Sequence, residues 1–331
     1  MKEIPTWAWR TALLLSATYC LTLGVFSIAW PLNGVDFEIF HAAGSAIREG
    51  LNPYSPGVIG APLAYPPSWM PFCAVFALLP FGISLPLWKA LNIGCLIGSV
   101  QLSIALIAPN ASYAQRSLIW CYSLLLWPTI TTFFTGNTPL LLLVSTLYAL
   151  DLSMRKCDTR GAVFLSIALV KPMLAIPTVV YLLFQRKFAL VLIAGIISSA
   201  LWIAGIYITG LTFDVFIRSI KAYSEMNLAS DPTTVGMPHV LAGVFGLGST
   251  VAREVSFASG MILMLLTIPL LAAKHVPQEQ TPLPLLLLLG PVFFGPAATI
   301  WYSSFLCSSG SCGSEMKAEA GRVRFRCCFF C

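Results

Sequence analysis

The sequence predicts an all-α protein that crosses a membrane several times. Of its 331 residues, 57% are hydrophobic and only 10% are charged, and the mean hydropathy is +0.83. A soluble domain carries about 25% charged residues. Here the charges fall in short clusters between apolar runs of about 17 to 25 residues, the length that a helix needs to cross a hydrocarbon core. These runs cannot form one soluble core.

The charge pattern excludes a nucleic-acid-binding protein. The formal net charge is +6, and the basic residues are scattered between the apolar runs without a sustained basic groove. We therefore expect partners in the membrane and not a nucleic acid.

The first apolar run, Thr11–Trp30, follows Lys2 and Arg10. Positive residues mark the cytoplasmic side of a span, so we expect a cytoplasmic N-terminus and a retained helix, with no small-residue cleavage site after it. The loop that carries Asp36 then lies on the outer face.

Prolines interrupt the next apolar stretch, Ser68–Leu85. Between Pro71 and Pro80 only about eight residues can form uninterrupted helix, roughly 12 Å of length against a hydrocarbon core of about 30 Å. We expect a short re-entrant or interfacial helical piece on the outer side.

Three spans then alternate in direction, with an outer turn at Gly136-Asn137 before the third. They are Leu87–Ala108, Ser117–Thr135 and Thr138–Leu152. The basic cluster Arg155, Lys156 and Arg160 follows and marks the cytoplasm again.

Lys171 and Pro172 stand midway between two basic clusters that are only about 25 residues apart. A lysine at the centre of a single span costs about 2.5 to 3.5 kcal/mol on insertion scales, and a proline beside it breaks the helix. The segment therefore predicts two short, partly inserted helices with Lys171 at the outer apex.

Phe188–Thr209 is expected to run outward, and a long polar segment to lie outside over 210–254. Two further spans follow at Ser256–Ala273 and Leu283–Phe305. This arrangement places nine Lys and Arg residues inside and six outside, which supports the orientation.

The end of the chain, 307–331, differs from all that precedes it because it is rich in cysteine and shows no helical or strand periodicity. We expect one domain over 1–306, apparently truncated, and a foreign tail such as a frameshift produces. The tail contains one Cys-x-x-Cys pair, Cys328 and Cys331, but no second such pair and no histidine accompanies it, so a zinc site is not expected.

Four segments resemble one known family of membrane enzymes. They are DFEIFHAAGSAIREGLNPY from Asp36, YPPSWMPFCAVFALLPF from Tyr65, GNTPLLLL from Gly136, and RGAVFLSIALVKPMLAIPTVVYLL from Arg160. Together they are similar to glycosyltransferase family 87, a domain formerly labelled DUF2029, over roughly residues 10 to 306. The Asp36 loop with Gly50 and Tyr54, and Tyr65-Pro66-Pro67, carry the most specific part.

The resemblance implies a GT-C multi-helix architecture and an activity. Members move a sugar, typically mannose, from a polyprenyl phosphate carrier onto a lipid or glycan acceptor outside the membrane. The acidic residue of the first outer loop, here Asp36, is by resemblance the catalytic base. This chain departs from the family after Leu306, where members continue with further helices.

The same chemistry follows from the residues. A polyprenyl phosphate sugar releases a phosphate monoester, whose charge one cation stabilises, so no metal cofactor is demanded. One carboxylate must accept the proton of the acceptor hydroxyl in an inverting single displacement. Asp36 is the first candidate and Glu38 a weaker one, since their side chains point to different helix faces. Asp36 could instead only cap the helix that follows.

Other polar residues are candidates for substrate binding. Lys171 is the first choice for the donor phosphate, although it could simply snorkel to the interface. The remaining candidates are Arg48, with Arg218 and Lys221 as alternatives, His239 for the phosphate, Tyr54 and Tyr65 for a sugar or isoprenoid groove, and Asn137 at the outer turn. Interfacial aromatic belts and a plain turn explain the last three equally well.

The sequence thus predicts a multi-pass cell-membrane hexosyltransferase with its active-site loop outside. Two other classes stay open: a transporter or flippase of lipid-linked sugars, and a non-catalytic remnant. Transporters often contain inverted repeats, and none is visible here.

Overall fold

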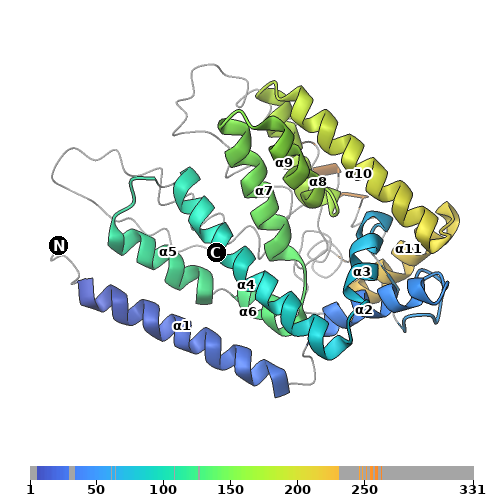
Figure 1. The fold of residues 1–331 in the computed structure, drawn as a ribbon, viewed down its shortest axis with the longest axis horizontal. Helices are drawn as coiled ribbons and strands as arrows, with labels where there is room; N and C mark the ends of the chain where they lie inside the picture. The colour runs from blue at the N-terminus through green and yellow to red at the C-terminus, as the bar shows by residue number, and fades with distance from the viewer. Residues whose placement is uncertain are drawn as a thin grey trace.

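The computed structural model describes residues 6–29, 34–60, 62–63, 65–107, 109–125 and 127–230, with isolated positions between 246 and 262. All regular structure in these ranges is helical (Figure 1). The helices are α1 (Thr6–Ala29), α2 (Val35–Arg48), η1 (Pro67–Trp69), α3 (Met70–Phe76), α4 (Phe81–Ile107), α5 (Tyr113–Leu125), α6 (Trp127–Thr135), α7 (Pro139–Met154), α8 (Asp158–Ala168), α9 (Pro172–Phe184), α10 (Phe188–Thr209) and α11 (Phe213–Ser230).

Two of the described helices are long and apolar enough to cross a membrane, α4 and α10. α10 has 22 residues and leaves large apolar side chains uncovered, with Leu192 65% exposed and Ile203 68% exposed. A lipid environment accounts for such a surface, whereas a water-exposed helix of this composition would be unstable. The number and direction of further crossings stay a prediction, and the predicted spans after 230 lie outside the described residues.

The predicted first span is observed as one continuous helix, α1, which packs along α5. The predicted span Ser117–Thr135 corresponds to α5 and α6, which end and begin on either side of residue 126, a position outside the described residues.

The first part of the proline-rich stretch forms η1 and the seven-residue α3, which confirms the short helical piece that the sequence predicts. α4, in contrast, begins at Phe81 and not at the expected Leu87. Pro86 is therefore inside a helix. It is only the sixth residue of α4, so one helical hydrogen bond is lost near an end where the first turn has no intrahelical partners.

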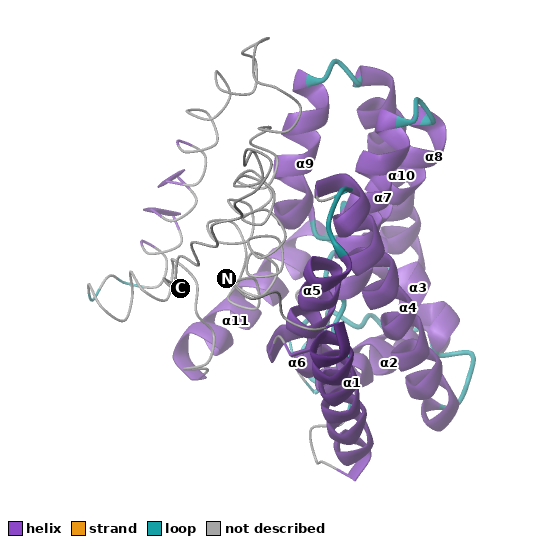
Figure 2. Ribbon diagram, turned by 90° about the vertical axis from the view of Figure 1, so that its left-hand side faces the viewer, coloured by secondary structure: helices purple, strands orange, loops and turns teal. Residues whose placement is uncertain are grey.

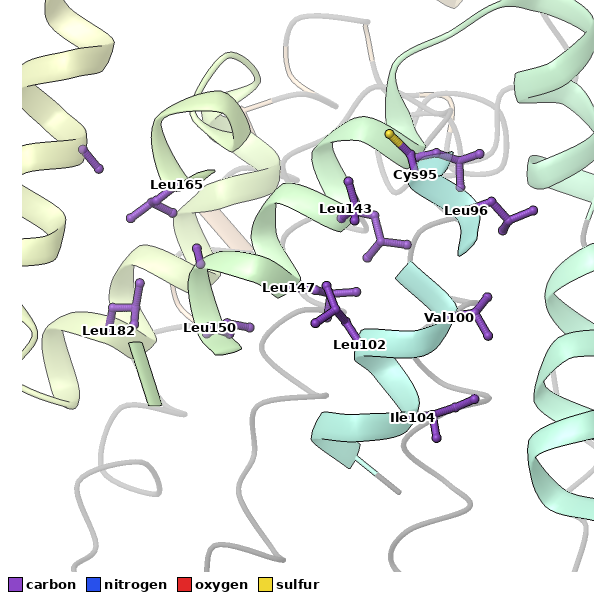
Figure 3. Packing of buried hydrophobic residues seen from close by; sticks show 14 of the residues in the cluster. Cys95, Leu96, Val100, Leu102, Ile104, Leu143, Leu147, Leu150, Leu165 and Leu182 are labelled. Atoms are coloured by element: carbon purple, nitrogen blue, oxygen red, sulfur yellow. The ribbon is translucent and has the colours of Figure 1, made fainter. Parts of the chain in front are cut away.

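α7, α8, α9 and α10 run side by side, and α4 flanks α7 (Figure 2). Figure 3 shows the leucine-rich core between them, with buried side chains from α4, α7, α8 and α9. This cluster is apolar throughout and holds the long helices in place.

A second core is aromatic and lies under α2. It brings together Phe37, Phe40, Trp69 and Trp88, with the rings of Phe37 and Trp88 stacked 5.6 Å apart. Gly44 allows α2 to approach α3 closely here, since a Cβ at Gly44 would lie 2.1 Å from the carbonyl oxygen of Cys73.

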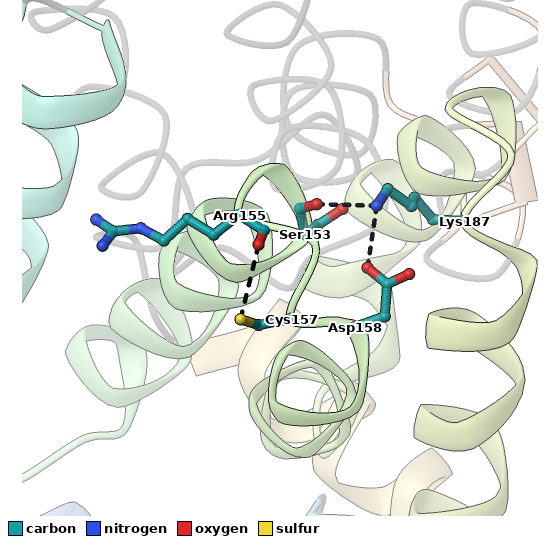
Figure 4. Close-up of polar contacts among 5 residues, drawn as sticks. All are labelled: Ser153, Arg155, Cys157, Asp158 and Lys187. Atoms are coloured by element: carbon teal, nitrogen blue, oxygen red, sulfur yellow. Dashed lines mark hydrogen bonds and ion pairs between the residues drawn. The ribbon is translucent and has the colours of Figure 1, made fainter.

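Basic residues lie in the α7–α8 and α9–α10 turns, and Figure 4 shows the polar contacts that join the two turns. The Lys187 Nζ lies 3.0 Å from the Asp158 carboxylate and donates to the Ser153 carbonyl at 2.9 Å. This ion pair joins the α7–α8 turn to the α9–α10 turn. Both predicted cytoplasmic clusters therefore meet at the same end of α7, and the loop at Lys171 lies at the other end of α8 and α9.

Candidate active site

Asp36 lies in the first turn of α2 and does not cap it. The N-cap is Gly34, whose φ of 75° suits glycine, and its N–H donates to the Phe134 carbonyl at 2.7 Å. No side-chain hydrogen bond caps this helix. The capping role considered for Asp36 is therefore wrong, because the chain enters α2 two residues earlier. Its carboxylate remains available, at the positive end of the helix dipole.

A tight turn between α6 and α7 holds the partners of Asp36. Gly136 has a φ of 74°, and a Cβ there would lie 2.8 Å from the Cβ of Phe37. The indole of Trp88 donates to the Gly136 carbonyl at 2.7 Å, which fixes the turn from the other side. The Asp36 carboxylate accepts hydrogen bonds from the Thr135 hydroxyl and the Asn137 amide.

Lys171 lies in the break between α8 and α9, which confirms the predicted pair of short helices. Its backbone is the N-cap of α9, and Pro172 begins that helix. Its half-buried ammonium donates to the Tyr65 hydroxyl at 2.9 Å and lies 4.4 Å from the centre of that ring.

Tyr65 joins the cation to the turn. Its hydroxyl donates to the Asn137 Oδ1 at 3.1 Å, and its backbone carbonyl accepts a hydrogen bond of 2.7 Å from the buried Tyr54 hydroxyl. Four segments distant in sequence thus converge: the start of α2, the loop before η1, the α6–α7 turn and the α8–α9 break.

Burial sets the electrostatics of the two charged groups. It raises the pKa of Asp36, while the hydrogen bond from Thr135, the charge of Lys171 and the hydrogen bond from Asn137 oppose that rise. Burial also lowers the pKa of Lys171 to about 8, against the opposing effect of Asp36. Among the described ion pairs none joins Asp36 to Lys171. The two charges therefore stabilise each other across the Tyr65 and Asn137 side chains.

Aromatic rings cover one side of this polar cluster. Phe40 meets Tyr65 edge to face with 4.6 Å between ring centres, and Trp69 lies 6.2 Å from Tyr65. Trp69 is 1% exposed. These rings fix the orientation of Tyr65 and exclude water from that side.

The other predicted binding residues lie elsewhere. Arg48 is twelve residues beyond Asp36 on the same helix, about 18 Å away along its axis, and it donates to the Ala77 carbonyl. Arg218 pairs with Asp214 on an exposed part of α11, and Glu38 is exposed. The side chain of Lys221 and all of His239 lie outside the described residues.

Sequence reasoning missed Thr135, which the structure places against Asp36. In the sequence it stands at the end of the apolar run Ser117–Thr135. The available signal was a hydroxyl directly before the Gly136-Asn137 turn. Within the described ranges, no group of three or more His, Cys, Asp or Glu side chains is placed to hold a metal ion.

A profile of glycosyltransferase family 87 matches residues 63–304, which is well over half of the chain. The chain belongs to glycosyltransferase family 87. This confirms the resemblance seen in the sequence and identifies a glycosyltransferase. The segment matched to family 87 contains Tyr65, Asn137 and Lys171, whereas Asp36 precedes it. No curated protein and no solved structure matched the chain.

Proposed function

We propose that this protein is an integral membrane glycosyltransferase with a GT-C-like helix bundle, which transfers a hexose, most simply mannose, from a polyprenyl phosphate donor to a lipid or glycan acceptor. The observation that carries the proposal is the cluster of Asp36 and Lys171, a carboxylate and an ammonium held close together without forming an ion pair.

Asp36 acts as the general base. The acceptor hydroxyl gives its proton to the carboxylate while its oxygen forms a bond to the anomeric carbon of the sugar. The bond from that carbon to the phosphate oxygen breaks, and its electron pair leaves with the polyprenyl phosphate. One displacement of this kind inverts the anomeric configuration. The hydrogen bonds from Thr135 and Asn137 hold the carboxylate in one orientation.

Lys171 stabilises the charge that develops on the departing phosphate. A cation at this point acts on the transition state more strongly than on the bound donor, because the leaving oxygen gains charge during the reaction. The product is a phosphate monoester and not a diphosphate, so one cation suffices and no metal ion is required.

The separation of the two charges favours displacement chemistry. An inverting mechanism needs the base and the leaving group on opposite sides of the reacting carbon. A direct Asp36–Lys171 ion pair would neutralise both groups, whereas here Tyr65 and Asn137 keep them apart.

We place this end of the bundle at the outer face of the cell membrane. The support is the opposite end, where the Lys187–Asp158 pair brings together two basic turns of the kind retained in the cytoplasm. The lipid tail of the donor would then contact the exposed apolar face of α10 from within the bilayer.

The test uses membrane vesicles that contain the protein, with their own lipids as acceptors, and labelled polyprenyl phosphate mannose or glucose as donor. We expect Asp36→Asn to lower product formation by about 10²- to 10⁴-fold, the range of general-base catalysis. The matched control is Glu38→Gln, an exposed acid two residues away, which should leave the rate unchanged.

An Asp36→Asn protein that forms product at the wild-type rate would overturn the assignment of the base. Movement of the labelled donor across the vesicle membrane, without product and unaffected by the Asp36→Asn change, would indicate a transporter instead.

A further inference from the structure

A series of three hydrogen bonds connects Lys171 to Asp36 through Tyr65 and Asn137, and in each bond the donor is on the Lys171 side. The ammonium donates to the Tyr65 hydroxyl at 2.9 Å, and that hydroxyl donates to the Asn137 Oδ1 at 3.1 Å. The Asn137 amide in turn donates to the Asp36 carboxylate. An ammonium can only donate and a carboxylate can only accept, whereas a hydroxyl and an amide do both. The series of hydrogen bonds therefore begins at the positive charge and ends at the negative one.

We propose that Tyr65 and Asn137 are positioning residues, which form a bridge that holds the phosphate-binding cation and the general base at a fixed separation. This inference rests on the proposed function and changes the role assigned to Tyr65 and Asn137: their polar groups are engaged with protein side chains and not with the sugar. Asn137 Oδ1 also accepts the Thr138 N–H at 2.7 Å, so this backbone donor and the Tyr65 hydroxyl orient the amide together.

The neighbours of Tyr65 hold it rigidly in place, as expected for a side chain that keeps two charges apart. Its ring is fixed by Phe40 and Trp69, and its backbone carbonyl by the Tyr54 hydroxyl. Because the ring lies against the ammonium at 4.4 Å, Lys171 is held to Tyr65 by a cation–π contact as well as a hydrogen bond. The side chain that separates the charges is therefore itself immobile.

Two further ionisable groups, Cys73 and Tyr223, lie near the bridge, and the Tyr65 hydroxyl of the bridge is itself ionisable. Burial raises the pKa of the Tyr65 hydroxyl well above its ordinary value, and it also raises the pKa of the Cys73 thiol of α3. The charge that Tyr223 of α11 would carry raises the pKa of Tyr65 further. Tyr65 and Cys73 therefore stay neutral near pH 7, and Asp36 and Lys171 are the two charges that the bridge joins.

The Tyr65→Phe change keeps the ring and removes only the hydroxyl. Lys171 then loses an acceptor that favours its charged form, so the pKa of Lys171 falls. Asn137 loses one of the two donors that orient its amide, so its hydrogen bond to Asp36 weakens and the pKa of Asp36 rises. The active form needs Asp36 ionised and Lys171 protonated. The pH range of activity should therefore narrow from both sides.

The first measurement is the pH dependence of kcat for hexosyl transfer. For Tyr65→Phe we expect kcat to fall about tenfold or more, with little change in KM, and both limbs of the profile to move inward. Asn137→Ala should move only the acidic limb, because the Lys171–Tyr65 contact remains. Tyr181→Phe is the matched control, since it removes a phenolic oxygen ten residues beyond Lys171 along α9, about 15 Å away along the axis.

The second measurement does not depend on activity. Brief treatment with acetic anhydride at a series of pH values acetylates Lys171 only when its amine is neutral, and mass spectrometry gives the fraction modified. The half-point should lie near pH 8 in the wild type, lower in Tyr65→Phe, and unchanged in Tyr181→Phe.

If Tyr65→Phe leaves both pH limbs and the Lys171 half-point unchanged, the bridge is wrong even if wild-type transfer is observed. A shifted half-point in a protein that transfers no sugar would support the bridge and refute the proposed function. A rise in KM alone, with an unchanged half-point, would make Tyr65 a substrate-binding residue and overturn the inference.

Discussion

The approach of α2 to α3 at Gly44 should control the position of the base. Gly44 lies eight residues beyond Asp36 on the same helix, about 12 Å along the axis. In the Gly44→Ala variant the new Cβ would lie 2.1 Å from the carbonyl oxygen of Cys73 and 2.6 Å from its carbonyl carbon. Both atoms belong to the backbone of α3 and cannot rotate away.

The two helices must therefore separate by about 1 Å to restore van der Waals contact. Overpacking of this kind costs about 1 to 3 kcal/mol of stability. Asp36 would move with α2, whereas Lys171 would stay in place in the break between α8 and α9. A displacement of about 1 Å in a catalytic group can lower the rate about 10²-fold, so kcat should fall further than the loss of stability alone would cause.

The assay combines thermal unfolding of the detergent-solubilised protein with hexosyl transfer in vesicles. Gly94→Ala is the matched control, since a Cβ at Gly94 of α4 meets no atom within 4 Å, and it should unfold at or above the wild-type temperature. Wild-type stability and rate in Gly44→Ala would refute the close α2–α3 contact and its effect on Asp36.

Three further results are expected. The transfer rate should have a bell-shaped pH dependence. It falls on the acidic side as Asp36 is protonated, at a pH above the ordinary range of aspartate, and on the alkaline side near pH 8 as Lys171 loses its proton. A rate that rises steadily through pH 9 would contradict the role of Lys171. Adding a metal chelator such as EDTA should leave the rate unchanged, and a loss restored by Mg²⁺ would contradict charge stabilisation by Lys171 alone. In a double-mutant cycle of Lys187→Met and Asp158→Asn, the half-exposed pair should contribute about 0 to 1 kcal/mol to unfolding without changing kcat.

The sequence predicted those residues of the site that interrupt the pattern of apolar runs. Lys171 stood out because it is a charge within an apolar stretch, and Asp36 because it is an acid directly after the first apolar run. Gly136-Asn137 is a turn signal between two apolar segments. A charge within a membrane sequence costs free energy, and a turn requires a special backbone conformation, so both stand out as candidate functional positions. In the structure Asp36, Lys171 and the Gly136-Asn137 turn belong to one site.

The contacts between these residues could not be predicted from sequence. Thr135 has a hydroxyl that a helix can satisfy with its own backbone, so its presence at the end of an apolar run gives no signal. The direction of the Tyr65 hydroxyl depends on the packing of Phe40 and Trp69, which are distant from Lys171 in the chain.

The broken helices of this protein explain how Asp36 and Lys171 come together away from the basic turns. In a bilayer an interrupted helix is tolerated only where its backbone groups find partners or line a polar cavity. The break before α9 meets this condition, because the N–H groups of Leu169, Val170 and Lys171 donate to carbonyls of α8. The Gly34 N–H likewise donates to the Phe134 carbonyl at the end of α6. Since the backbone is satisfied locally, the side chains at these breaks are free to face one another, and the ends of short helices supply the polar groups that uninterrupted spans cannot.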